Sequence, residues 1–129
     1  MVNCTPHLYS LPRSKKLLTA YDYRQVFEHQ QNFRFANKYF TILAKSNGLE
    51  HARIGIVVSK KALKRAHDRN LVKRLVRESF RLQNHTLPSI DIVFLAKTQA
   101  TTITTHEFFN QLENCYGLMQ RYFANRITK

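Results

Sequence analysis

The residues best suited to chemistry in this sequence are cations, and they are concentrated in one segment. Between residues 60 and 81 there are nine Lys or Arg and two acids, a net charge of +7 in a chain whose total is +13. Ammonium and guanidinium groups at this density favour phosphate oxygens, because each neutralised phosphate releases a bound counterion. Nucleic acid is therefore the first candidate partner, and an anionic membrane surface is the second. The side chains that we predict to bind nucleic acid are Lys60, Lys61, Lys64, Arg65, Arg69, Asn70, Lys73, Arg74, Arg77 and Arg81.

A helix would place most of these cations on one face. At about 100° per residue, the polar positions that fall within an arc of roughly 100° are Asn70, Lys73, Arg74, Arg77 and Arg81. The opposite, apolar side carries Leu71, Val72, Leu75, Val76 and Ser79, with Phe80 at its border. A solvated helix face usually mixes positive and negative charges, so a face of one sign indicates a bound polyanion. A plain solvated surface is the alternative. Asp68 is the expected N-cap of this helix.

No arrangement for catalysis by protein groups accompanies the cations. A nuclease that uses two metal ions needs carboxylates converging on ions about 4 Å apart, whereas the eight acids here are scattered singly. The six histidines show no metal-ligand spacing, and neither a Gly-rich phosphate loop nor a nucleophile elbow is present. Cys4 and Cys115 form neither a zinc motif nor a disulfide framework. We predict no catalytic residue and no protein metal site, although a metal-free pair of histidines remains open.

The elements that must position the cations alternate between helices and strands. A first helix is expected at about residues 21–30, and apolar runs at residues 39–44, 54–58 and 90–96 have the character of strands, with a turn at Asn47–Gly48. The basic helix is expected at about residues 68–84, before Pro88, and a last helix at about 106–125. At 129 residues, the chain is expected to form one domain, 1–129, with a loose segment at 1–16. The predicted fold class is α+β, a single-domain α-β sandwich in the order α-β-β-β-α-β-α.

The sequence gives no sign of export or of membrane attachment. Its longest apolar stretches, at residues 54–58 and 90–96, are too short to span a bilayer. The N-terminus lacks the apolar core of a signal peptide, Val2 replaces the glycine that myristoylation needs, and no cysteine offers a prenylation site near the C-terminus. We therefore expect a cytoplasmic protein with no membrane partner.

Two stretches carry a resemblance to a known family. Residues 53–61 (RIGIVVSKK) and 65–81 (RAHDRNLVKRLVRESFR) closely resemble the signature of the protein subunit of bacterial ribonuclease P, and the likeness extends to residues 23–27, 87–88 and 91–97. The resemblance implies an α-β sandwich whose strand–helix–strand unit has a left-handed crossover, against the usual rule. It also implies that the partners are the ribonuclease P RNA, which is the catalyst, and precursor tRNA. The holoenzyme removes the 5′ leader by endonucleolytic hydrolysis, with Mg²⁺ held mainly by the RNA subunit, and the polypeptide alone is not expected to be catalytic.

The resemblance also assigns roles to individual residues. Arg69, Asn70, Lys73, Arg74 and Arg77 match the family's RNA-binding helix, but Leu71 stands where the family has an arginine. The side chains that we predict to bind the leader are the aromatics Tyr23 and Phe27 with the cations Arg13 and Lys16. The resemblance implies that the leader-binding cleft lies between the first helix and the sheet, where one face of the first predicted strand would carry Tyr39, Thr41 and Leu43. Ordinary core packing is the alternative for the aromatics.

Three other functions compete with this interpretation. A ribosomal-type protein that binds structured RNA without a catalytic complex would carry a similar cationic face. A helix-turn-helix DNA-binding protein is disfavoured because a strand precedes the basic helix, so we expect no DNA partner. A stand-alone metal-dependent nuclease would need the clustered carboxylates that the sequence lacks.

Overall fold

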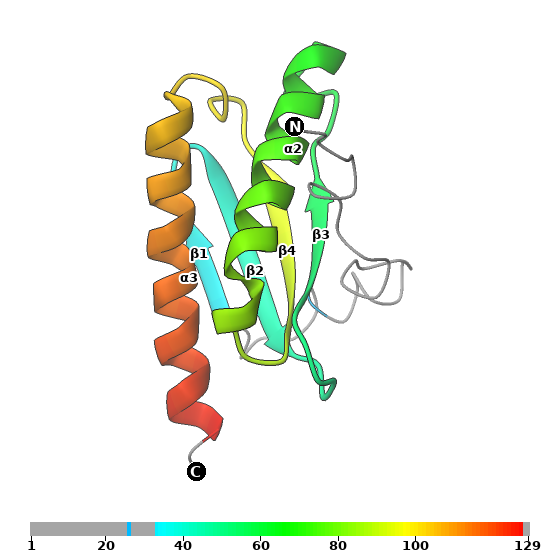
Figure 1. Cartoon of the computed structure of the whole chain (residues 1–129). Coiled ribbons are helices and arrows are strands. Elements are labelled where there is room, and N and C mark those ends of the chain that lie inside the picture. Colours follow the sequence, from blue (N-terminus) through cyan, green and yellow to red (C-terminus); the bar gives the residue numbers. More distant parts are fainter. Residues whose placement is uncertain (1–25, 27–32, 128–129) are drawn as a thin grey trace, which may run out of the picture.

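The computed structural model describes Val26 and residues 33–127 (Figure 1). The elements in chain order are β1 (Phe33–Ala36), β2 (Phe40–Ser46), β3 (Arg53–Val57), α2 (Ala66–Gln83), the short 3₁₀ helix η3 (Asn84–Thr86), β4 (Ile90–Ala96) and α3 (Thr105–Ile127). The order β-β-β-α-β-α is therefore as predicted, and the sequence analysis had given bounds for every described strand except β1. The loose segment expected at 1–16 lies outside the described residues. So does the first helix, apart from Val26, which has a helical conformation.

The four strands form one open sheet in the order β1-β2-β4-β3. β1 pairs with β2 and β2 with β4 in antiparallel fashion, whereas β3 and β4 are parallel. The loop between β2 and β3 turns at Asn47–Gly48, as predicted, and Gly48 has a φ of 71°, which favours glycine. Because β4 inserts between β2 and β3, segments that are far apart in the sequence meet at the same ends of the sheet.

The two parallel strands are joined through α2 by a left-handed crossover. In Figure 1, β3 and β4 both run upward, α2 lies between the viewer and the sheet, and β4 lies to the left of β3. A right-handed connection would place β4 on the other side of β3. The unusual crossover that the family resemblance implied is therefore present.

The main core lies between the sheet and the helices α2 and α3, which lie on the same face of the sheet (Figure 1). Its strand residues alternate with period two: Phe40, Ile42 and Ala44 on β2, and Ile90, Ile92 and Phe94 on β4. α2 contributes Val72, Val76 and Phe80, while α3 contributes Phe108, Leu112, Cys115, Tyr116, Met119 and Phe123. The ring centroids of Phe40 and Phe94 are 5.1 Å apart, and those of Phe40 and Phe108 are 5.8 Å apart. These aromatic contacts anchor α3 to the centre of the sheet.

Two ionisable groups are buried in this core. Burial raises the pKa of the Cys115 thiol to about 12 and also raises the pKa of the Tyr116 phenol. Both groups are neutral at physiological pH. Because the thiolate is the reactive form of cysteine, Cys115 serves here as a small apolar core residue.

The opposite face of the sheet carries a second, smaller apolar cluster. Val26 packs there on Val93, with Leu43 and Leu95 beside them. Tyr39, Thr41 and Leu43 were predicted to share one face of β2. Leu43 lies on this opposite face, and Thr41 lies there too because side chains alternate along β2. The prediction is wrong for Tyr39, which packs against the main core. The reason is a turn: the Oδ1 atom of Asn37 accepts hydrogen bonds from the backbone N–H groups of Tyr39, at 2.8 Å, and of Phe40, at 2.9 Å. The strand alternation therefore starts at Phe40.

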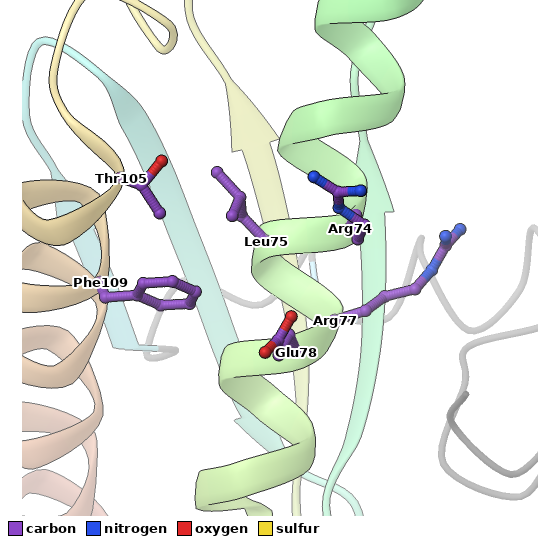
Figure 2. Close-up of a pocket in the computed structure, with 6 residues that line it drawn as sticks. All are labelled: Arg74, Leu75, Arg77, Glu78, Thr105 and Phe109. Carbon is purple, nitrogen blue, oxygen red and sulfur yellow. The ribbon is translucent and has the colours of Figure 1, made fainter. Parts of the chain in front are cut away.

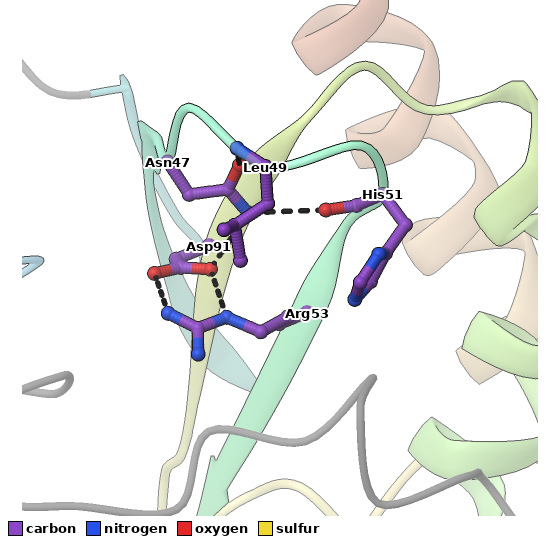
Figure 3. Close-up of polar contacts among 5 residues, drawn as sticks. All are labelled: Asn47, Leu49, His51, Arg53 and Asp91. Atoms are coloured by element: carbon purple, nitrogen blue, oxygen red, sulfur yellow. Dashed lines mark hydrogen bonds and ion pairs between the residues drawn. The ribbon is translucent and has the colours of Figure 1, made fainter.

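A buried carboxylate ties together the first residues of the two parallel strands (Figure 3). Asp91 of β4 is 5% exposed and accepts hydrogen bonds from Nε and Nη2 of Arg53 on β3, at 2.8 and 2.7 Å. It also accepts one from Nδ2 of Asn47, at 2.9 Å, and that amide donates to the carbonyl oxygen of His51 as well. The ion pair and the amide thus close the loop between β2 and β3 onto the start of the β3–α2–β4 unit.

Replacing Asp91 by asparagine should destabilise the fold, because it leaves the Arg53 guanidinium without its anionic partner in a largely buried position. We expect the free energy of unfolding in urea to fall by about 2–4 kcal/mol. Glu113→Gln, at an exposed position on α3, makes the same change of charge and should alter it by less than about 0.5 kcal/mol. Equal stability of the two variants would show that the Asp91 network contributes nothing to the fold.

Candidate nucleic-acid interface

The basic helix begins earlier than the sequence predicted. α2 starts at Ala66, its N-cap is Arg65 in an extended conformation, and no side chain makes a capping hydrogen bond. The prediction that Asp68 is the N-cap is therefore wrong, because the first intrahelical bond already joins the N–H of Arg69 to the carbonyl oxygen of Arg65, at 3.1 Å. Asp68 instead lies in the first turn, where a negative charge is favourable to the helix dipole.

Arg69 connects the helix to the segment that precedes it. Its Nη1 atom donates hydrogen bonds to the carbonyl oxygens of Leu63, at 2.9 Å, and Lys64, at 2.8 Å. This contact holds the lead-in, residues 58–65, against the first turn of α2. Arginine has five N–H donors, so those on Nε and Nη2 remain for other acceptors.

The two faces of α2 separate as the helical projection predicted. Val72, Val76, Ser79 and Phe80 are buried, and Leu71 and Leu75 are partly buried. The predicted RNA-binding side chains that are exposed are Lys60, Lys61, Lys64, Arg65, Asn70, Arg74 and Arg77, and those that are partly buried are Arg69, Lys73 and Arg81. We use the name cationic face for Asn70, Lys73, Arg74, Arg77 and Arg81. The structure thus brings the predicted side chains together on one helix and its lead-in.

The cations at the centre of this face have no acidic partner among the described residues. No carboxylate in the described part of the chain forms an ion pair with Lys73, Arg74 or Arg77. Like charges on adjacent turns raise the free energy of the folded state unless counterions or a polyanion offset them. The arrangement therefore suits an anionic ligand that spans several turns of the helix.

A groove separates α2 from α3 beside the cationic face (Figure 2). It has a volume of about 470 Å³ and is lined by Arg74, Leu75, Arg77, Glu78, Thr105 and Phe109. Leu75 and the ring of Phe109 point toward each other across it, while the guanidinium of Arg77 points away from α3. The sequence analysis did not associate Phe109 with the cationic face, since only the packing of α3 beside α2 brings them together.

A second cluster of cations lies at one end of the sheet. Lys38, Lys61 and Lys97 line a pocket of about 470 Å³ together with Ser59, Ala62, Thr98 and Gln99. Nζ of Lys97 donates a hydrogen bond to the carbonyl oxygen of Asn37, and Nζ of Lys38 lies 5.3 Å from the centre of the Tyr39 ring. Of the three lysines, only Lys61 was predicted. The other two are single cations in separate segments, and they meet because Phe40 at the start of β2 pairs with Ala96 at the end of β4.

The residues predicted to bind the leader, Tyr23, Phe27, Arg13 and Lys16, lie outside the described residues. Val26, which lies between Tyr23 and Phe27 in the sequence, packs on the sheet face that carries Val93. Across Val26 and residues 33–127, no three His, Cys, Asp or Glu side chains are grouped so that they could hold a metal ion. No helix in the same part of the chain is long and apolar enough to cross a membrane.

Comparison with known proteins identifies the family of this chain. The family model described as Ribonuclease P matches residues 11–120. The chain belongs to the ribonuclease P protein family. It is similar to the ribonuclease P protein component of Haemophilus influenzae strain PittGG, with 49% identity over 104 residues, which are 81% of this chain and 86% of the relative. It is also similar to the ribonuclease P protein component of Chromohalobacter salexigens, with 44% identity over 110 residues, which are 85% of this chain and 85% of the relative.

Solved structures of ribonuclease P proteins share the fold as well. The Staphylococcus aureus protein matches with a TM-score of 0.70 and 30% identity, over 78% of this chain and 90% of that one. The Thermotoga maritima protein matches with a TM-score of 0.67 and 30% identity, over 82% and 96%. The cationic face described above therefore lies on α2 of a ribonuclease P protein fold.

Arginines 69 and 74 should respond differently to replacement by lysine. Arg69→Lys keeps the charge but loses the paired hydrogen bonds to two carbonyl oxygens, and we expect a loss of about 1–2 kcal/mol in the free energy of unfolding. Arg74→Lys, at an exposed position of the same helix, should change it by less than about 0.5 kcal/mol. Urea unfolding of both variants tests this. A stable Arg69→Lys variant would mean that the lead-in does not depend on these bonds.

Proposed function

We propose that this chain is the protein subunit of a ribonuclease P ribonucleoprotein that acts in tRNA maturation in the cytoplasm. In this proposal the cationic face of α2 and the lead-in bind the catalytic RNA, and a second surface binds the 5′ leader of precursor tRNA. The observation that carries the proposal is that Lys73, Arg74 and Arg77 lie together on a helix whose other side is buried, with no carboxylate partner in the described part of the chain.

The cationic face suits the backbone of a folded RNA. Contacts with phosphates fix the position of a protein on a nucleic acid without reading its sequence, and guanidinium groups can bind phosphate oxygens in pairs. Four or five neutralised phosphates would give log K a slope of roughly −3 to −4.5 against log salt concentration. Leu71 cannot supply the cation that the family has at its position. The nearby exposed cations Arg74 and Lys64 supply positive charge on either side of it.

The other face of the sheet suits a single strand. Val26, which lies between Tyr23 and Phe27 in the sequence, packs there on Val93. Aromatic rings beside a strand of RNA provide stacking surfaces that accept any base, which is what a leader of variable sequence requires. Arg13 and Lys16 precede this segment, and Lys38, Lys61 and Lys97 lie at one end of the sheet, where they can neutralise phosphates.

Catalysis belongs to the RNA in this proposal. The described side chains do not fit a metal centre, because their carboxylates, histidines and cysteines are not grouped. The Mg²⁺ of the hydrolysis is therefore assigned mainly to the RNA subunit. The protein contributes by neutralising phosphate repulsion between the catalytic RNA and precursor tRNA, which lowers the concentration of Mg²⁺ that the reaction needs.

Reconstitution tests the proposed function. We expect that adding this protein to a bacterial ribonuclease P RNA at low Mg²⁺ restores cleavage of the leader from precursor tRNA. The variant Arg74→Gln/Arg77→Gln should require a higher protein concentration, because two phosphate contacts are lost. Tight RNA binding without stimulated cleavage would favour a ribosomal-type RNA-binding protein. Cleavage by the protein without the RNA would favour a stand-alone nuclease.

Tyr23 tests the leader surface separately. We expect Tyr23→Ala to weaken binding of precursor tRNA to the holoenzyme by about 5- to 100-fold, the effect of losing one stacked base, and to leave binding of mature tRNA unchanged. The measurement is the affinity of the reconstituted holoenzyme for the two RNAs. An equal loss for both would mean that Tyr23 supports the fold and does not touch the leader.

A further inference from the structure

The groove between α2 and α3 has features that a phosphate-binding surface does not need. Phe109, in the second turn of α3, is only partly buried, and its ring points toward Leu75 on α2 (Figure 2). Together the two side chains give the groove an apolar part beside the exposed guanidinium groups of Arg74 and Arg77. Phosphate gains nothing from an aromatic ring, whereas a nucleobase gains about 1–3 kcal/mol when it stacks on one.

Glu78 is the second unexplained feature of this groove. It is the one acid in the last three turns of α2 and lines the groove with its side chain partly buried. No hydrogen-bond donor or cation within the described residues contacts its carboxylate, although Arg74 is one turn away and Arg81 three residues away. A carboxylate on a surface that binds phosphate weakens that binding. It becomes favourable if the ligand presents N–H groups to it.

We propose that the α2–α3 groove binds one unpaired nucleotide of the RNA, with its base stacked on Phe109 and its exocyclic amino group donating to Glu78. The phosphate of this nucleotide lies against Arg74, and the neighbouring phosphate lies against Arg77 on the outer side of α2. The inference rests on the proposed binding of RNA to the cationic face and extends that surface from α2 to α3. Adenine, cytosine and guanine carry an amino group that can meet Glu78, and uracil does not.

The chemistry of the groove favours a nucleotide over a peptide or a second copy of this chain. An acidic peptide would place carboxylates beside Glu78, and a basic one would be repelled by Arg74 and by a chain of net charge +13. A second copy would bring the same excess of positive charge. A nucleotide matches all three parts of the groove, since it combines an anionic phosphate, an aromatic base and N–H donors. A volume of about 470 Å³ lies within the range of small-ligand sites.

The stacking contact can be separated from the phosphate contacts by salt dependence. Phe109→Leu keeps an apolar side chain in the groove and should weaken binding of the ribonuclease P RNA by about 5- to 100-fold, with the slope of log K against log salt unchanged. Arg74→Gln/Arg77→Gln should reduce that slope by roughly 1 to 2. If the wild-type protein binds the RNA and Phe109→Leu binds it equally well, the groove is not a base site and the proposed function stands. If the wild-type protein does not bind the RNA, the proposed function fails.

A tryptophan at the same position reports stacking directly and keeps the helix packing. The chain has no tryptophan, so Phe109→Trp introduces a single fluorophore, and Leu118→Trp places one on the opposite side of α3, where Leu118 is 38% exposed. Saturation with the ribonuclease P RNA should quench the emission of Phe109→Trp strongly and leave that of Leu118→Trp unchanged. Equal emission changes in the two variants would overturn the proposal.

Replacing Glu78 tests the proposal, because a charge effect and a hydrogen bond to the base predict opposite changes in RNA affinity. If the cationic face acted by charge alone, Glu78→Met would strengthen RNA binding, because it removes a negative charge. The proposal requires the opposite, a loss of about 2- to 10-fold, because the base loses its hydrogen-bond acceptor. Thermal unfolding of each variant checks that the fold is intact. Tighter binding by Glu78→Met would exclude the contact between Glu78 and the base.

Discussion

The burial of one side of α2 is the constraint on which the rest of this structure depends. Val72, Val76 and Phe80 are 0–1% exposed and pack into the main core, so the helix cannot rotate about its axis without losing that burial. Burial of three such side chains contributes on the order of 5 kcal/mol. This fixes the direction in which Lys73, Arg74 and Arg77 point. The chain thus obtains a surface of one charge from the same interaction that stabilises its fold.

The crossover through α2 determines where that surface lies on the molecule. Because β3 and β4 are neighbours and parallel, α2 must run antiparallel to them and cover them, and α3 covers the antiparallel half of the sheet beside it. The cationic face then borders the groove toward α3 on one side, and β3, at the edge of the described sheet, lies on the other. The opposite sheet face, with Val26 on Val93, remains on the far side of the β-layer. One four-stranded sheet therefore separates the two surfaces proposed for the catalytic RNA and for the leader.

The order of helices and strands and the cationic face could be predicted largely from local pattern. Apolar residues recur every 3.6 residues along one face of a helix and every two residues along one face of a strand. Contacts that depend on the order of the strands in the sheet could not be predicted in this way. Lys38 and Lys97 are 59 residues apart and meet only because β2 pairs with β4. Phe109 and Arg74 line the same groove only because α3 packs beside α2. Tyr39 and Asp68 were misplaced for a local reason, since an Asn37 side-chain turn and an earlier helix start override the alternation and capping patterns.

Electrostatics explains why Lys73, Arg74 and Arg77 have no carboxylate partner in the described part of the chain. With 21 Lys and Arg against eight Asp and Glu, most cations have no acid available, and the best-buried acid, Asp91, is committed to Arg53 at the foot of the β3–α2–β4 unit. Within the described residues, the Arg53–Asp91 ion pair holds that unit together, and Lys73, Arg74 and Arg77 of α2 have no carboxylate partner. A ligand that binds only the folded state adds to stability in proportion to the logarithm of its concentration over its Kd. Phosphates bound to the cationic face as proposed would therefore stabilise the helix that they contact, because they offset the repulsion between Lys73, Arg74 and Arg77.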